Sequence, residues 1–281
     1  MKIAVVAPSR SLPRQAADQL FSLKEKHSEL SNVTISIDDQ CFAASGHFAG
    51  DDQARAAAFL DAANDPTIDT VWFARGGYGS GRILPLILPA LRAPAAHKTY
   101  IGYSDTGYIL AALAQMGVGK SVHGPMVSDL LRPGGDDAVL RVLRWLAADS
   151  EASLEPSLEQ GKRSYAFNLT ILASLAASQY LPNLDGAVLM IEEIGEHLYA
   201  IDRNLMTAFS SGHLDRLQGI RCGRVSDVPQ NDIDFGQSTE EIVRSWCDRY
   251  RVDYLGPADI GHDVDNKLVP FPIAFRQALL P

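Results

Sequence analysis

Residues 99–116 have the sequence TYIGYSDTGYILAALAQM. The apolar residues of 99–103 predict a buried strand, and the apolar spacing of 107–116 predicts a helix. Ser104 therefore lies in a tight turn between a strand and a helix. A serine in such a turn is exposed beside helix amides that can stabilise an oxyanion, which points to nucleophilic catalysis. The competing interpretation is that Ser104 or Asp105 only caps the helix.

Strand and helix patterns alternate throughout the first half of the chain. Strands are predicted at 2–7, 33–37, 70–74 and 99–103, and helices at 13–26, 51–63, 81–91, 107–116 and 137–146. Pro85 and Pro89 are expected to interrupt the helix at 81–91. Such alternation predicts an α/β protein with a doubly wound, mostly parallel sheet. Ligands bind at the carboxyl ends of such strands, where Ser104 would lie.

The second half of the chain has a different pattern. The segment 147–164 is polar and irregular and is predicted to be a linker. Beyond it, helices are predicted at 168–177, 202–209 and 239–250, and a strand at 186–191. A chain of 281 residues is long enough for two domains. We therefore predict an N-terminal α/β domain at 1–150 and a smaller α+β domain at 165–281.

Composition argues against several classes of partner. The net charge of −9 disfavours nucleic acid, because phosphate binding requires clustered Lys and Arg. The apolar run at 3–7 is too short for a signal peptide, and no uncharged apolar stretch reaches transmembrane length. Cys41, Cys222 and Cys247 are odd in number and lack CxxC spacing, as expected in a reducing compartment. We expect a cytoplasmic protein with no membrane or nucleic-acid partner.

A glycine-rich segment, ARGGYGSGR at 74–82, follows the third predicted strand. It fits neither a dinucleotide fingerprint nor a P-loop, because Arg82 stands where the first needs glycine and the second needs lysine. The glycines still allow the backbone to approach a ligand closely. The alternative is a glycine turn that serves chain geometry alone.

Two later segments contain the other residue types that serine hydrolysis requires. The sequence EEIGE at 192–196 follows an apolar strand, and GHDVDN at 261–266 has the pattern of a loop. Ser104, Glu192 and His262 would supply a nucleophile, an orienting carboxylate and a base, since geometry rather than chain order defines a triad. The alternative for His262 is a solvated surface residue.

Structural alternatives also apply to the acidic residues of these segments. An ion-pair network is the preferred interpretation of Glu193, Glu196 and Arg203. Metal binding is a further option for Glu192, His262, Asp263 and Asp265. No metal-ligand spacing supports it, so we expect no metal or other cofactor.

Several of these segments together resemble the LD-carboxypeptidase family, whose members are serine peptidases that trim murein tetrapeptides. The microcin C self-immunity peptidases are their relatives. The resemblance rests on HFAGDDQAR at 47–55, ARGGYGSGRILP at 74–85, IGYSDT at 101–106, HGP at 123–125, IEEIGE at 191–196, IDR at 201–203 and GHDVDN at 261–266. It extends over nearly the whole chain, with the motifs in the family's order.

The resemblance implies a role for each candidate residue. Ser104 is expected to be the nucleophile, His262 the general base and Glu192 the residue that orients it. The backbone amides of Gly77 and Asp105 are the implied oxyanion donors. Arg75, by its position in the glycine loop, is a candidate to bind the terminal carboxylate of a murein tetrapeptide, with a structural loop anchor as the alternative.

The family fold is an N-terminal doubly wound domain joined to a C-terminal domain with a barrel-like sheet, and the site lies between them. A homodimer is also implied.

Two departures from the family pattern concern the cleft wall and therefore substrate preference. Ala166-Phe167 and Ala177-Ser178 stand where the family commonly has Gly-Gly and Gly-Thr. One alternative function is a peptidase that cleaves aminoacyl-nucleotide conjugates, with Tyr78, Tyr103 or Trp246 presented to the base. Another is a non-catalytic binding module for a cell-wall peptide.

Overall fold

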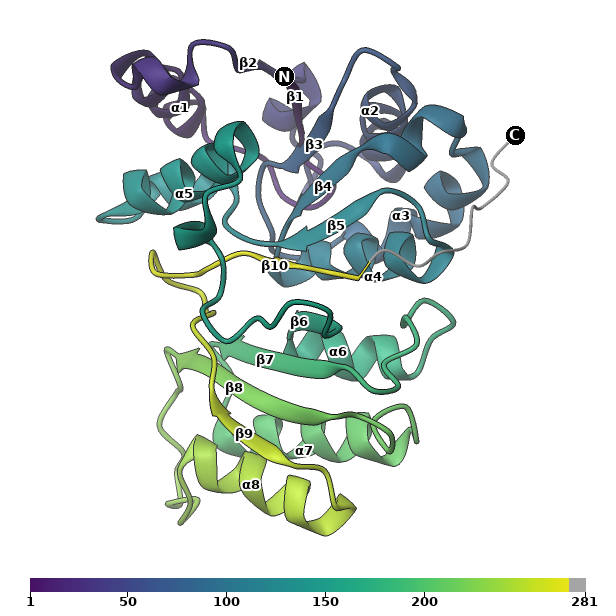
Figure 1. Cartoon of the computed structure of the whole chain (residues 1–281), viewed down its shortest axis with the longest axis vertical. Helices are drawn as coiled ribbons and strands as arrows, with labels where there is room; N and C mark the ends of the chain where they lie inside the picture. Colours follow the sequence, from purple (N-terminus) through teal and green to yellow (C-terminus); the bar gives the residue numbers. More distant parts are fainter. Residues whose placement is uncertain (273–281) are drawn as a thin grey trace.

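The computed structural model describes residues 1–272 and shows an α/β protein with two sheets (Figure 1). The first sheet has the strand order β10-β5-β4-β3-β1-β2, parallel except for β10. Its strands are β1 (Lys2–Val6), β2 (Thr34–Ile37), β3 (Thr70–Phe73), β4 (Thr99–Gly102), β5 (Lys120–His123) and β10 (Val269–Pro270). The helices among them are α1 (Arg14–Lys26), α2 (Asp52–Asn64), α3 (Ser80–Ile87), α4 (Gly107–Met116) and α5 (Gly135–Ala148). The α/β class and the doubly wound sheet are confirmed.

Helices cover both faces of the first sheet. Ile3 and Val5 of β1 belong to a core that includes residues of α1 and α5, whereas Ala4 and Val6 belong to a core with residues of α2, α3 and α4. Successive side chains of a strand point to opposite faces, so a strand buried on both faces is apolar throughout. This explains why β1 and β3 were predictable from their apolar runs.

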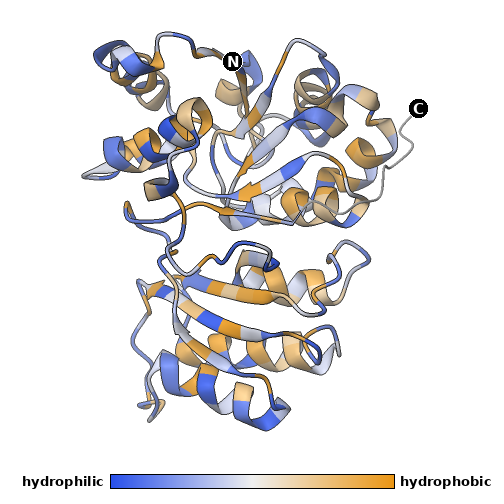
Figure 2. Cartoon of the chain, in the orientation of Figure 1, coloured by the Kyte–Doolittle hydropathy of each residue, from blue (hydrophilic) through white to orange (hydrophobic). Residues whose placement is uncertain are grey.

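The second sheet is open and parallel, in the order β6-β7-β8-β9. Its strands are β6 (Ser164–Asn168), β7 (Val188–Ile194), β8 (Gly219–Ser226) and β9 (Tyr254–Pro257), and its helices are α6 (Leu169–Ala176), α7 (Leu198–Ser210) and α8 (Thr239–Tyr250). The three helices lie side by side along the sheet, and Figure 2 shows hydrophobic residues along β7 and hydrophilic ones on α8. The expected barrel-like closure is absent from these four strands, because β6 and β9 are free edges of the sheet.

Two further details of the sequence prediction need correction. Helix α3 continues through Pro85 and ends at Ile87, before Pro89, so only the second proline marks an interruption. Ser164 begins strand β6, whereas the linker was expected to extend to this residue. None of the described helices is both long and apolar enough to cross a membrane.

The chain returns to the first sheet after completing the second. Val269 and Pro270 of β10 pair with His123 and Val122 of β5 in antiparallel register. The loop at 261–266 therefore lies between β9 of the second sheet and β10 of the first. This return was not predicted, and it places the loop at the junction of the two halves (Figure 1).

Candidate active site

Ser104 occupies a strained turn between β4 and α4. Its φ of 59° lies in the left-handed region, which costs a non-glycine residue about 1–2 kcal/mol. A Cβ on Gly76 would lie 3.3 Å from Ser104 Oγ, so this glycine leaves room around the hydroxyl. The N-cap residue of α4 is Thr106, without a side-chain cap. The competing interpretation, in which Ser104 or Asp105 only caps this helix, is therefore wrong.

Asp105 instead holds the glycine-rich segment against the turn that contains Ser104. Its buried carboxylate accepts hydrogen bonds from Ser80 N at 2.9 Å and Gly79 N at 3.2 Å, at the start of α3, and from Ser9 Oγ. Ser80 Oγ in turn donates a hydrogen bond of 2.5 Å to the Asp105 carbonyl. Within residues 1–272 the backbone amides of Gly77 and Asp105 donate to no protein acceptor. Both amides are thus available as donors beside Ser104.

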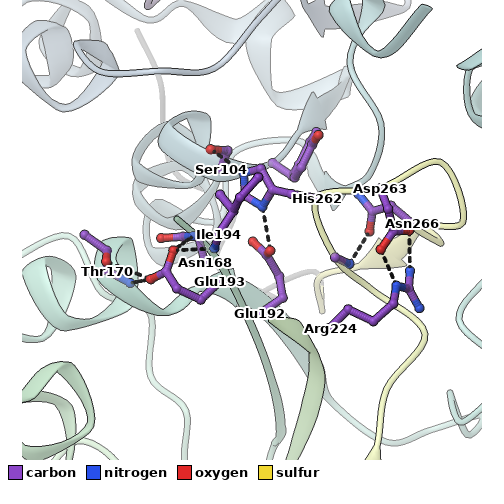
Figure 3. A network of polar contacts seen from close by, with 12 residues as sticks. Ser104, Asn168, Thr170, Glu192, Glu193, Ile194, Arg224, His262, Asp263 and Asn266 are labelled. Carbon is purple, nitrogen blue, oxygen red and sulfur yellow. Dashed lines mark hydrogen bonds and ion pairs between the residues drawn. The ribbon is translucent and has the colours of Figure 1, made fainter. Parts of the chain in front are cut away.

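Ser104, His262 and Glu192 form one hydrogen-bonded chain (Figure 3). His262 Nδ1 donates to Glu192 Oε2 at 2.6 Å, and His262 Nε2 accepts from Ser104 Oγ at 2.9 Å. A carboxylate only accepts, so this contact places the imidazole proton on Nδ1 and leaves Nε2 as a base toward the hydroxyl. Ser104 and His262 are 158 positions apart in the chain, and Glu192 and His262 are 70 positions apart. The fold thus brings three distant residues together.

Glu192 and its neighbour Glu193 point in different directions. Glu193 accepts hydrogen bonds from Asn168 Nδ2, the amide and hydroxyl of Thr170, and Ile194 N, and so anchors the start of α6 (Figure 3). The pairing of β7 with β8 shifts register between Ile191 and Glu193, a bulge that re-aims side chains. Burial raises the pKa of Glu193.

The predicted ion-pair network is wrong for the described residues. No ion pair joins Glu193, Glu196 and Arg203 within residues 1–272. The guanidinium of Arg203 lies over the ring of Tyr199 instead.

Arg224 pairs with the acidic residues near His262. Its guanidinium pairs with both carboxylate oxygens of Asp263 and with Asp259 Oδ1 at 2.5 Å. In the described part of the chain, no group of three His, Cys, Asp or Glu side chains is arranged to hold a metal ion. The metal interpretation of Asp263 and Asp265 therefore has no geometric support.

The loop that carries His262 is fixed mainly by residues that the sequence analysis did not assign. Asn266 Oδ1 accepts from Gly261 N and from His123 Nε2, both at 3.2 Å. Arg141 Nη1, on α5, donates to the carbonyls of Val264 and Asn266 at 2.9 Å each. His123 and Asn266 stand in motifs quoted above, whereas Arg141 had no sequence signal.

Acid pH is expected to destabilise the fold through His123. Burial lowers the pKa of this side chain from 6.5 to about 4, against opposing effects of Glu192 and Asn266, and with a further lowering by His262. Between these two pH values, His123 binds a proton in the unfolded chain but not in the native chain. The free energy of unfolding therefore has its full value above pH 6.5 and falls as the pH approaches 4. The loss should be about 3 kcal/mol.

Urea unfolding as a function of pH measures this effect. In His123→Gln, an amide can still donate to Asn266 but cannot titrate, and the loss between pH 6.5 and 4 should shrink by most of that amount. The matched control is His213→Gln, at an exposed position, which should leave the pH profile unchanged. An identical profile for wild type and His123→Gln would contradict the assignment.

The candidate site opens into a cavity of about 260 Å³. Ser104 and His262 line it together with ten other residues: Arg10, Arg75, Gly76, Gly77, Tyr103, Met126, Ser128, Asp129, Leu131 and Arg132. A larger cavity of about 690 Å³ lies between β8, β9 and the start of α8. We assign the site to the smaller cavity, because no residue of the Ser-His-Glu chain lines the larger one.

The three aromatic residues considered for base stacking lie in different surroundings. Tyr103 lines the cavity, but it is buried and donates its hydroxyl to Asp129 Oδ1 at 2.9 Å. Trp246 is buried on α8 and donates to Asp202 Oδ1 at 2.7 Å. Tyr78 is 55% exposed but is not among the residues that line the cavity. Of these three aromatic residues, Tyr103 alone lines the cavity, and its side chain is almost fully buried.

Family models cover both halves of the chain. Residues 3–124 match the LD-carboxypeptidase N-terminal domain, and residues 163–276 match the LD-carboxypeptidase C-terminal domain. The chain belongs to the LD-carboxypeptidase family. The resemblance noted in the sequence is thus confirmed, and the protein is a serine-type carboxypeptidase.

Individual relatives agree with this membership. The murein tetrapeptide carboxypeptidase of Pseudomonas aeruginosa is 26% identical over 96% of this chain and 91% of its own length. The crystal structure of muramoyltetrapeptide carboxypeptidase from Oxalobacter formigenes has a TM-score of 0.79 at 24% identity, covering 96% of this chain and 92% of that one. The structure of MccF in complex with glutamyl sulfamoyl guanosine has a TM-score of 0.75 at 17% identity, covering 98% and 96%. At these identities the two structures show the fold alone.

Proposed function

We propose that this enzyme hydrolyses the L,D-peptide bond that releases the terminal D-alanine of murein tetrapeptides, as part of peptidoglycan recycling. The observation that carries the proposal is the hydrogen-bonded chain of Ser104, His262 and Glu192 beside an open cavity. The family membership and the Pseudomonas aeruginosa relative support the substrate class. A cytoplasmic location and a homodimer stay predictions.

The proposed mechanism is a two-step acyl transfer. His262 Nε2 accepts the proton of Ser104 as Oγ attacks the carbonyl carbon, and Glu192 stabilises the imidazolium that forms. The amides of Gly77 and Asp105 would then donate to the oxyanion, each contributing about 100- to 1,000-fold in rate. The imidazolium passes its proton to the leaving amine of D-alanine. Water, activated by the same imidazole, hydrolyses the acyl-enzyme.

Mass spectrometry of the reaction products tests this function. A murein tetrapeptide ending in D-alanine should lose one alanine on incubation with the wild-type protein. An aminoacyl-nucleotide conjugate, which is the substrate of the alternative function, should stay intact under the same conditions. Release of the nucleotide with an intact tetrapeptide would replace the proposed substrate, and no cleavage of either compound would contradict the peptidase assignment.

A further inference from the structure

The cavity beside Ser104 contains more positive charge than its carboxylate can neutralise. Three arginines and one aspartate line it. Arg132 lies near Asp129, with 3.5 Å between Nε and Oδ1. Within residues 1–272, Arg10 makes no hydrogen bond or ion pair, and Arg75 donates only to the Ser11 carbonyl at 3.2 Å. Two of the arginines that line this cavity therefore have no carboxylate partner among residues 1–272.

The two unpaired arginines are close enough to act on each other. Burial and then the charge of Arg10 lower the pKa of Arg75, so the positive charge of Arg10 disfavours that of Arg75. Like charges held together in a partly buried place cost free energy until an anion joins them. An anionic ligand would remove this repulsion and gain hydrogen bonds from two planar donors.

Gly77 leaves room for the side chain of Arg10 at the wall of the cavity. Its φ of 118° lies in the left-handed region, and a Cβ there would overlap Cδ and Cγ of Arg10. The aliphatic part of Arg10 thus lies directly against the residue whose amide is a proposed oxyanion donor. Any other residue at position 77 would displace this arginine.

We propose that Arg10 and Arg75 together bind the free carboxylate at the C-terminal end of the peptide substrate, which restricts the enzyme to removal of a terminal residue. This inference rests on the proposed function and adds Arg10 as a residue that determines specificity. Arg75 was a candidate from the sequence, whereas Arg10 was not considered there.

The covalent geometry of a peptide requires the carboxylate to bind in this same cavity. Only the C–N, N–Cα and Cα–C bonds, about 1.33, 1.46 and 1.52 Å long, separate the scissile carbonyl carbon from the terminal carboxylate carbon. The carboxylate therefore lies within about 4 Å of the atom that Ser104 attacks. A cation that recognises it has to line the cavity of the nucleophile, as Arg10 and Arg75 do.

The test compares one tetrapeptide in two forms, ending in D-alanine or in D-alaninamide. Wild type should have a kcat/KM for the acid about 10- to 100-fold above that for the amide, the range expected for charge-assisted hydrogen bonds. Arg10→Met and Arg75→Met keep an apolar stem, and each should lower kcat/KM for the acid about tenfold or more with little effect on the amide. In the double variant, the ratio of kcat/KM for the acid to kcat/KM for the amide should approach one.

A matched control and a second readout keep this test decisive. Arg82→Met removes an arginine of the same glycine-rich segment that already pairs with Asp52, and the acid preference should persist. Equal cleavage of acid and amide by wild type, or an equal fall for both substrates in the variants, would overturn the proposal.

Calorimetry measures the binding of the two peptides to Ser104→Ala and to the double variant that also contains Arg10→Met. This experiment tests the role of Arg10 in carboxylate binding without any turnover. If wild type cleaves neither peptide, the proposed function fails. Tighter binding of the acid that depends on Arg10 would still support the arginine pair, whereas equal affinities would overturn it.

Discussion

Ser104→Ala is expected to abolish practical turnover, with a fall in kcat on the order of 10⁴- to 10⁶-fold, while the fold persists. The substitution removes only Oγ, whose one hydrogen bond among the described residues is the 2.9 Å bond with His262 Nε2. Glu192 keeps its bond to the imidazole, so the rest of the site should stay in place. Steady-state hydrolysis of the tetrapeptide and a urea unfolding curve measure the two effects.

Ser128→Ala provides a matched control for this prediction. Ser128 lines the same cavity and its backbone amide bonds to the Ala74 carbonyl, whereas the side-chain hydrogen bonds of His262 within residues 1–272 go to Glu192 and Ser104. We expect Ser128→Ala to retain kcat within about tenfold, since it removes no group of the proposed mechanism. Retention of near wild-type kcat in Ser104→Ala, or an equal loss in Ser128→Ala, would show that the nucleophile is another group.

The first half of the fold was predictable because its signals are local. β3 and β4 are apolar on both faces, and the helix at 107–116 has the bounds that the sequence predicted. A parallel sheet covered by helices follows from such alternation without knowledge of any long-range contact. The position of Ser104 between β4 and α4 belongs to the same local pattern.

The strands β5, β6, β8, β9 and β10 were not predicted, because their sequences lack a clear apolar pattern. β8 contains Arg221, which donates to the Leu255 carbonyl, and Arg224, which pairs with Asp259. Most of this strand is only partly buried. β10 has only two residues, and its place depends on pairing with β5, far away in the chain. Pairing between distant segments is a tertiary effect that no window of sequence shows.

The supporting residues of the candidate site were harder to predict than the residues proposed to react. Ser104, Glu192 and His262 were identified because serine hydrolysis needs these residue types and family motifs contain them. Arg10 and Arg141 are isolated basic residues in the sequence, and ordinary surface positions are the usual places for such residues. Only the fold shows their positions: Arg10 lies against Gly77, and Arg141 bonds to the loop at 261–266.

Glu192→Gln is expected to lower kcat by about 10⁴-fold with little loss of stability. His262 Nδ1 donates to Glu192 Oε2 at 2.6 Å, and Glu192 Oε1 has no partner among the described residues. No other contact fixes the orientation of a glutamine amide at this position. If its NH₂ group turns toward Nδ1, the imidazole proton moves to Nε2, where it opposes the hydroxyl of Ser104 instead of accepting from it.

Glu193→Gln should show the opposite behaviour, which makes the adjacent residue the best control. Both oxygens of Glu193 accept from pairs of donors: Oε1 from Asn168 and Ile194, and Oε2 from the amide and hydroxyl of Thr170. A glutamine must turn its NH₂ group toward one of these pairs, which should cost about 1–3 kcal/mol of unfolding free energy. Its kcat should stay within about tenfold of wild type, because Glu193 does not contact His262 (Figure 3). Kinetics and urea unfolding of both variants therefore separate the two carboxylates, and a 10⁴-fold loss in Glu193→Gln with normal kcat in Glu192→Gln would reverse their proposed roles.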